Sequence, residues 1–189
     1  MKHWPAYLQR QRSEYLKPSL PLECIADMVV VIPCYNEKEL TLTLDSLVKC
    51  APPETHTQVV IVINSTVKSD EKAIQQNRET YREAQKFSKT FSTDRLLFVP
   101  VIFENLPKKH GGVGLARKIG MDLAIDYFYK TANPNGILVS LDADCTVSKN
   151  YLQDIYGAFQ DKKVQCTIHN FHHRVEDNNE AIEKAIREY

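Results

Sequence analysis

The chain is poor in the features that place a sequence in a specialised class. No apolar run among its 189 residues approaches the ~20 residues of a membrane span, and Met1 to Arg12 is polar and aromatic, unlike a signal peptide. The five cysteines are odd in number and lack the Cys-x-x-Cys spacing of metal sites, which favours reduced thiols in a cytosol over a disulfide framework. We therefore expect a soluble, cytoplasmic protein.

An excess of charge of one sign is also missing. Lys+Arg and Asp+Glu each number 24, which gives a formal net charge of zero. No nucleic-acid partner is therefore expected, and any attraction to phosphate must be local. The length and the 43% of hydrophobic residues suit one globular domain.

What the sequence does contain is an alternation of strand and helix signals. Continuous apolar runs predict buried strands at residues 28–32, 59–63, 96–103 and 137–141, and a fifth strand is expected at 164–171. Helical spacing predicts helices at residues 39–49, 70–87, 115–129 and 149–159, and from 178 onward. Repeated strand-helix units predict an α/β fold in three layers, a mostly parallel sheet between helices.

The domain is expected to cover residues 28–189, with residues 1–27 as an N-terminal extension. The extension carries Trp4, Tyr7 and Tyr15 among many Arg and Lys residues. Packing on the domain is the first interpretation of these aromatic side chains, and peripheral contact with a membrane surface is the alternative.

Two carboxylates one residue apart form the most informative feature. Asp142-Ala143-Asp144 follows an apolar run, and side-chain alternation on a strand would project both acids to one side. Two such charges ~4 Å apart repel by about 4 kcal/mol at an effective dielectric of ~20, so a proton or a divalent cation is needed to relieve them. A hard metal with a phosphate-bearing substrate fits, and a solvated pair that caps the next helix is the alternative.

Polar clusters follow the other expected strands. Pro33 to Glu37 follows the first strand and Asn64 to Thr66 the second, and in parallel sheets ligands bind beyond such carboxyl ends. Tyr35 offers a flat face for a base, Glu37 can accept from sugar hydroxyls, and Asn64 offers both a donor and an acceptor. Turn and helix-cap roles are the structural alternative for Asn36 and Asn64.

Three segments together resemble family 2 glycosyltransferases of the GT-A fold, whose sheet is Rossmann-like. Val29 to Glu37 is similar to the family's opening strand and its Pro-x-Tyr-Asn-Glu turn. Gly112 to Gly120 resembles the Gly-x-Gly-x-Ala-Arg-Asn-x-Gly segment, and Asp142-Ala143-Asp144 matches the Asp-x-Asp motif. The resemblance covers roughly residues 28–171 and suggests the N-terminal, nucleotide-sugar-binding portion of such an enzyme.

The resemblance implies roles for the residues in these segments. Contacts to the nucleotide-sugar would come from Pro33, Tyr35, Glu37, Asn64, Arg117, Asp142 and Ala143. Asp144, with Asp142, would bind Mn²⁺ or Mg²⁺ that bridges the diphosphate. For Arg117 the structural alternative is a surface ion pair with Asp122 or a neighbour.

The implied activity is hexosyl transfer from a nucleotide-diphosphate sugar by an inverting mechanism. A UDP-sugar is the donor that we expect first. The acceptor would be a glycan, a lipid or a small molecule, in bacterial-type cell-surface or polysaccharide synthesis, in the cytoplasm or at the inner face of the membrane. The family's general base lies well downstream of its Asp-x-Asp motif, and Glu176-Asp177 is too close to serve. We therefore expect a chain truncated at its C-terminus, with the acceptor half and the base beyond residue 189, and inactive alone.

Departures from the family pattern occur at three places. Asn64 stands where an aspartate commonly reads the uracil ring, so the hydrogen-bonding reach is kept and the charge is lost. Lys118 replaces a usual Asn, and the polar helix expected at 70–87 resembles an insertion.

Two other functions compete with this interpretation. Asp142 to Thr146 also fits the Asp-x-Asp-x-Thr motif of haloacid-dehalogenase-type phosphatases, although those enzymes carry it on their first strand. A non-catalytic nucleotide-sugar-binding module is the other alternative. A Rossmann dehydrogenase fits poorly, because Arg117 follows the glycines where Gly or Ala is needed.

Two basic clusters near these segments have open roles. The histidines 169, 172 and 173 could reach a metal, or lie at the surface or core edge. Lys108, Lys109 and His110 could meet the diphosphate or form a solvated loop.

Overall fold

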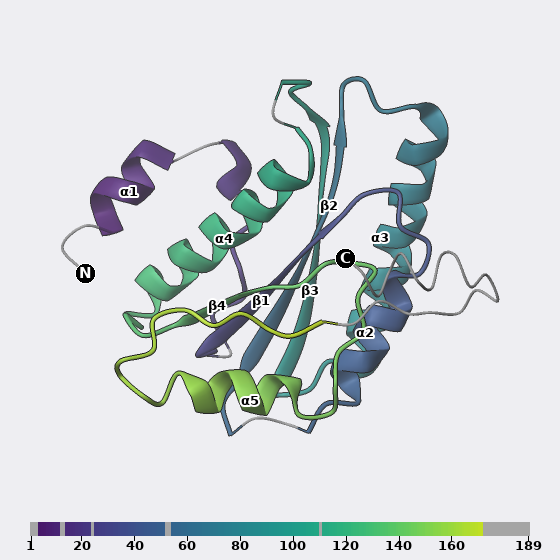
Figure 1. The fold of residues 1–189 in the computed structure, drawn as a ribbon. Helices are drawn as coiled ribbons and strands as arrows, with labels where there is room; N and C mark the ends of the chain where they lie inside the picture. The colour runs from purple at the N-terminus through teal and green to yellow at the C-terminus, as the bar shows by residue number, and fades with distance from the viewer. Residues whose placement is uncertain (1–3, 12–13, 24, 52–53, 110, 172–189) are drawn as a thin grey trace, which may run out of the picture.

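One parallel sheet organises the molecule. The computed structural model describes residues 4–11, 14–23, 25–51, 54–109 and 111–171. The sheet consists of β1 (Met28–Cys34), β2 (Thr57–Thr66), β3 (Leu96–Leu106) and β4 (Ile137–Ser140), in the order β3-β2-β1-β4 (Figure 1). Every neighbouring pair is parallel. The expected α/β class with a parallel sheet is confirmed.

Helices cover both faces of the sheet and complete the three layers. One face carries α2 (Leu40–Val48), α3 (Glu71–Phe91) and α5 (Tyr151–Ala158). The other carries α4 (Val113–Lys130), with α1 (Trp4–Gln11) and the 3₁₀ helix η1 (Glu14–Leu16) against α4. The alternation of β1 explains the two cores: Val30 packs toward α2 and α3, and Val31 packs toward α4.

Close approach of α4 to the sheet depends on Gly120. A Cβ atom at this position would overlap Val31 Cγ1 on β1 and lie 3.0 Å from Val62 Cγ2 on β2. The glycine therefore lets the helix axis sit nearer to the strands than a side chain would allow. This is the last glycine of the segment that resembles the family pattern, and its role is in packing.

Two expected elements differ from the structure. Residues 164–171 are not a strand but an exposed irregular segment, with Ile168 96% exposed and Phe171 70% exposed. Their alternation of apolar and polar residues satisfies the strand pattern, but they do not pair with β4, which is the last strand of the sheet in the described part of the chain. The helix expected from residue 178 lies outside the described residues. The fourth strand also ends at Ser140, earlier than expected, whereas α3 continues to Phe91.

The N-terminal helix contacts α4 through a buried carboxylate. Asp122, 2% exposed, accepts a hydrogen bond of 2.7 Å from the Tyr7 hydroxyl and pairs with Lys118 on its own helix. Leu8 and Leu20 are buried nearby, and the Ala26 N–H donates to the Tyr127 hydroxyl. In the part of the chain described, no helix is both long and apolar enough to cross a membrane.

The Tyr7 hydroxyl should stabilise the fold in a pH-dependent way. Burial, and then the bond to Asp122 and the charge of this residue, raise the pKa of Tyr7 to about 12. The unfolded chain therefore loses this proton first above pH 10, so the stabilisation is complete below pH 10 and disappears toward pH 12. We expect Tyr7→Phe to lower the free energy of unfolding by about 1 kcal/mol at pH 7, and by less at pH 11.

Urea unfolding at the two pH values measures this difference. Tyr129→Phe is the control, because Tyr129 lies on the same α4 and is 42% exposed. Equal stability of Tyr7→Phe and the wild type at pH 7 would show that the hydrogen bond contributes nothing.

Candidate functional site

The strands β1 and β4 separate near their carboxyl ends. Their ladder ends at Val31 and Ser140, followed by one bond of 3.0 Å from the Leu141 N–H to the Val31 carbonyl. In a parallel ladder alternate residues of a strand face the same neighbour, so the next donor toward β4 would be Pro33, which has no N–H. The chain after β4 can therefore leave the sheet. The strand order also reverses here, between β1 and β4, which is the usual place for ligands in such sheets.

The turn after β1 exposes one aromatic ring and holds its backbone tightly. Tyr35 is 47% exposed, while Cys34 is buried before it. Asn36 has a left-handed φ of 52°, which asparagine tolerates better than most residues, and its N–H donates to Asn77 Oδ1 at 2.7 Å. The Glu37 carboxylate accepts from the Glu39 N–H at 2.8 Å, so it already serves partly as a local cap.

Burial keeps Cys34 out of the chemistry of this turn. Burial, and then the nearby charge of Glu37, raise the pKa of the Cys34 thiol to about 12. The thiol is therefore protonated at neutral pH, and it can act neither as a nucleophile nor as a thiolate ligand there.

Asn64 lies at the end of β2 with one half of its amide used and the other half open. The residue is 2% exposed, and its Nδ2 donates to the Gly111 carbonyl at 3.0 Å. No group in the described part of the chain donates to Oδ1. The Gly111 carbonyl fixes this orientation, because a flipped amide would place two acceptors together. A buried acceptor without a donor is costly, so this position suits a ligand that brings an N–H or O–H group.

The loop that receives Asn64 requires glycine. A Cβ atom on Gly111 would lie 2.5 Å from Thr66 Cγ2 and would overlap the Pro107 carbonyl. Gly112 and Gly114, by contrast, face open space at the start of α4. The two later glycines therefore leave room beside Asn64, whereas Gly111 closes the loop against β2 and β3.

The acid pair lies in a turn directly after β4. Asp142 and Asp144 are both exposed, and Ala143 between them is buried with its carbonyl bound by Thr43 at 2.7 Å. Arg117 on α4 donates to Asp142 at 2.6 Å and to the Ser140 hydroxyl at 2.8 Å. Arg117 thus forms an ion pair, but with Asp142 and not with Asp122, whose partner on α4 is Lys118. Arg117 relieves part of the predicted repulsion, so the two acids differ: Asp142 is paired with a cation, and among the described residues Asp144 is not.

Side chains on α2 and just after it anchor the acid loop, and the sequence did not single them out. Thr43 binds the Ala143 carbonyl, the Ser46 hydroxyl accepts from the Val147 N–H at 3.1 Å, and the Cys50 thiol donates to the Ser148 carbonyl at 3.4 Å. Thr43 and Ser46 are three residues apart on one face of α2, and Cys50 follows two residues after the end of this helix. That spacing is the only signal that could have found them, and their partners about 100 residues away are not visible in the sequence.

The donor set around the acid pair suits a hard cation that brings further ligands with it. Within the described residues, no group of three or more His, Cys, Asp or Glu side chains is arranged to hold a metal ion. Mg²⁺ is commonly held by one or two carboxylates together with substrate phosphates, which two exposed aspartates can supply. His169 contacts Tyr151, with ring centroids 5.2 Å apart, and His172 and His173 lie outside the described residues.

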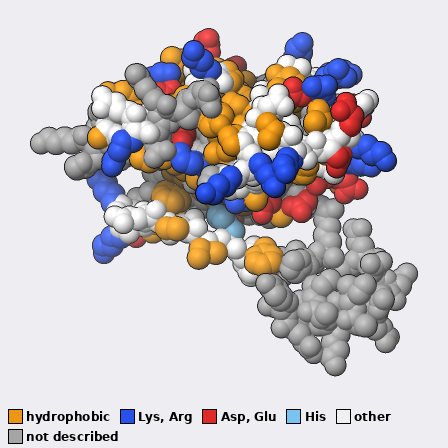
Figure 2. All heavy atoms as spheres, turned by 90° about the horizontal axis from the view of Figure 1, so that it is seen from above, with side chains coloured by type: hydrophobic (Ala, Val, Ile, Leu, Met, Phe, Trp, Pro, Cys, Tyr) orange, Lys and Arg blue, Asp and Glu red, His pale blue; other side chains and the backbone are white. Residues whose placement is uncertain are grey.

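The basic loop follows β3, at the edge of the sheet opposite to β4. Lys108 and Lys109 are exposed, and the neighbouring Lys108 lowers the pKa of Lys68, just past the end of β2. The loop continues to Gly111, whose carbonyl accepts from Asn64. His110 lies outside the described residues. Seen from this edge of the sheet, the surface carries both signs of charge beside apolar side chains (Figure 2).

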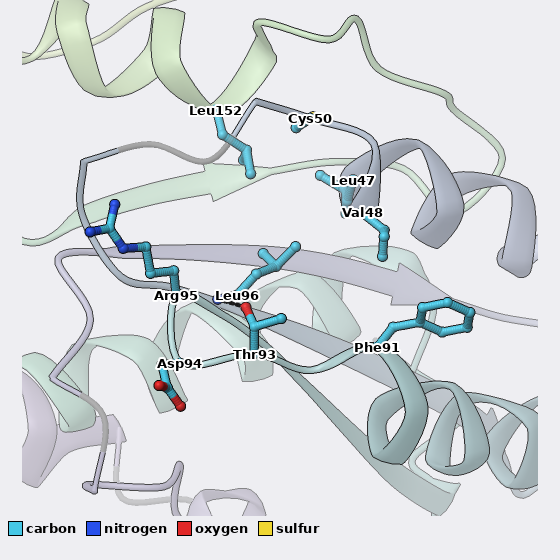
Figure 3. A pocket seen from close by; sticks show the side chains of 9 residues that line it. All are labelled: Leu47, Val48, Cys50, Phe91, Thr93, Asp94, Arg95, Leu96 and Leu152. Carbon is cyan, nitrogen blue, oxygen red and sulfur yellow. Dashed lines mark hydrogen bonds between the residues drawn. The ribbon is translucent and has the colours of Figure 1, made fainter.

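A cavity of about 450 Å³ lies at the opposite edge of the sheet. Its walls come from the end of α2, the end of α3, the start of β3 and α5 (Figure 3). Leu47, Leu96 and Leu152 line it, and Asp94 and Arg95 are its charged residues. This cavity lies where strands begin, so it is separate from the strand ends that carry Asn64 and the acid pair.

Comparisons with known proteins agree with the sequence patterns. The family model described as glycosyl transferase family 2 matches residues 29–186. Crystal structures of TarS from S. aureus are similar in part. TarS 1-349 shows 23% sequence identity and a TM-score of 0.43, over 70% of this chain and 32% of that chain. TarS shows 23% sequence identity and a TM-score of 0.44, over 72% of this chain and 20% of that chain. TarS 1-349 in complex with UDP shows 22% sequence identity and a TM-score of 0.43, over 70% of this chain and 32% of that chain. The chain thus spans about a third or less of these proteins. No curated protein matches it. Because the family model covers most of its length, the chain belongs to glycosyl transferase family 2.

Proposed function

We propose that this chain binds the nucleotide-sugar donor of a glycosyltransferase, with a UDP-sugar as the donor. The observation that carries this proposal is the open Oδ1 acceptor of Asn64, buried at the end of β2, while the neighbouring strand β1 is followed by the exposed ring of Tyr35. Uracil presents an N3–H donor between two carbonyl groups, and a flat ring can stack on tyrosine. Family membership supports the same choice of ligand.

The rest of the donor would lie across β1 toward the acid pair. In this proposal Glu37 and Asp142 would meet ribose and sugar hydroxyls, and Pro33 and Ala143 would also contact the donor. Asp144 and Asp142 would hold Mn²⁺ or Mg²⁺, which stabilises the negative charge of a departing diphosphate. Arg117 keeps Asp142 oriented and adds positive charge at the same place. Inverting transfer to a glycan, lipid or small-molecule acceptor, in the cytoplasm or at the inner face of its membrane, completes the proposal.

The phosphatase alternative has less support. Its Asp-x-Asp motif belongs after the first strand of a sheet, and Asp142 follows the last strand of the described chain. A nucleophilic aspartate would also lose reactivity while bound to Arg117 at 2.6 Å.

Calorimetric titration with UDP, GDP and dTDP, each with and without Mn²⁺, tests the proposal. We expect UDP to bind most tightly and Mn²⁺ to raise its affinity. Asp144→Ala should abolish the effect of Mn²⁺ with little loss of stability, because Asp144 is exposed. Asp154→Ala, at an exposed carboxylate on α5, is the control. Absence of binding by all three nucleotides, or an unchanged Mn²⁺ effect in Asp144→Ala, would contradict the assignment.

Removal of the open acceptor should weaken nucleotide binding. Asn64→Ala deletes Oδ1 and the bond to Gly111, and we expect UDP affinity to fall about tenfold or more. Ser65→Ala is the matched control, since Ser65 is equally buried one residue along β2. Equal losses in the two variants would point to general destabilisation of the strand end.

Loss of the bond from Thr43 on α2 to the acid loop should weaken binding of the metal but not binding of the base. Thr43→Val keeps the shape of a side chain that is 1% exposed and removes its bond to the Ala143 carbonyl. We expect a smaller gain in UDP affinity on addition of Mn²⁺, with metal-free UDP affinity nearly unchanged. Equal titration curves for Thr43→Val and the wild type, with and without Mn²⁺, would show that the loop needs no anchor.

A further inference from the structure

Helix α3, which resembled an insertion, reaches both loops that flank the proposed base site. We propose that Asn77 and Thr80 are positioning residues, which hold the turn after β1 and the end of β2 in the geometry that binds a nucleotide. This inference rests on the proposed function for its purpose, and on observed hydrogen bonds for its geometry.

Asn77 joins the ends of the two central strands. Its side chain is 1% exposed, and it uses both halves of its amide: Nδ2 donates to the Asn64 carbonyl at 2.8 Å, and Oδ1 accepts from the Asn36 N–H at 2.7 Å. The β1–β2 register ends at Cys34 and Ile63, so these two backbone groups lie just past the regular ladder. The Asn77 amide therefore replaces ladder bonds where the strands would otherwise separate.

Thr80 holds the next residue of the same turn. It is 2% exposed, and its hydroxyl donates to the Glu37 carbonyl at 2.9 Å, while Gln76 donates to that hydroxyl at 3.2 Å. Together with Asn77, it fixes the backbone on both sides of the peptide that joins Asn36 and Glu37. The left-handed φ of 52° at Asn36 is thus supported from α3.

The buried stripe of α3 shows why these polar residues need an explanation. Ala73, Asn77, Thr80, Ala84 and Phe87 are buried at spacings of three and four. Asn77 and Thr80 interrupt an otherwise apolar face, and burial of polar groups is unfavourable unless each finds a partner. Outside α3, the partners of these two side chains are backbone groups of the turn after β1 and the end of β2. Apolar residues could fill the same space without those bonds, so the hydrogen bonds to the loops explain the polar choice.

Contacts with backbone groups give this pair a distinct signature. Asn77 bonds to backbone groups and not to the Asn64 amide that would read the base. Its loss should therefore weaken the binding of every nucleotide by the same factor. A change at Asn64, whose own side chain would contact the base, should instead alter the ratio between the affinities for different nucleotides. This difference separates a positioning residue from a specificity residue.

The test compares Asn77→Ala and Thr80→Val with Ser88→Ala. Ser88 lies on the same helix and donates to the Phe98 carbonyl at 2.6 Å, far along α3 from the site, so its variant removes a similar bond elsewhere. UDP and GDP affinities are measured by calorimetry, and amide hydrogen exchange is followed at Asn36. We expect Asn77→Ala to weaken both nucleotides about tenfold, which is about 1.4 kcal/mol, with faster exchange at the Asn36 amide.

Thr80→Val should show a smaller loss of nucleotide affinity, with a stable fold. Ser88→Ala should leave nucleotide affinity and amide exchange at Asn36 unchanged. Unchanged exchange at Asn36 in Asn77→Ala, or equal losses of affinity in Asn77→Ala and Ser88→Ala, would overturn the inference. If the wild type bound no nucleotide, the proposed function would fail, and the Asn36 amide would still decide whether α3 holds the turn.

Discussion

The structure depends on the point where the ladder between β1 and β4 stops. Pro33 has no N–H to continue it, so the chain after β4 leaves the sheet and turns at Ala143 and Asp144. On the other side of β1, the ladder with β2 ends at Cys34 and Ile63. These endings determine which backbone groups need new partners. The rest of the site consists of side chains that supply those partners.

Helices on one face of the sheet provide most of these side chains. Residues of α2 hold the acid loop, and residues of α3 hold the turn after β1 and the end of β2. From the other face, Arg117 of α4 reaches Asp142, and Gly111 before that helix accepts from Asn64. Among the described residues of this site, the buried amide oxygen of Asn64 and the exposed carboxylate of Asp144 are acceptors that a ligand can use. A nucleoside diphosphate with a hard cation can satisfy both, the first through its base and the second through its metal.

The sequence predicted the elements and the strand ends well, because these follow from local pattern. Burial on both faces of β1 and β2 leaves continuous apolar runs, and a parallel sheet brings their polar ends to one edge. The sequence failed where a residue acts on a distant backbone group. Thr43 and Ala143 are 100 positions apart, and Asn77 binds two loops at once, which no spacing reveals. The prediction for the segment 164–171 also failed, since alternation alone does not ensure pairing, and this segment does not join β4 at the edge of the sheet.

The most direct measurement is a crystal structure of this chain with UDP and Mn²⁺. The account predicts uracil beside Tyr35, its N3 within hydrogen-bonding distance of Asn64 Oδ1, and the metal between Asp144 and the diphosphate. UDP bound elsewhere, for example in the apolar cavity beside α5, or a base that leaves Asn64 Oδ1 without a donor, would contradict it.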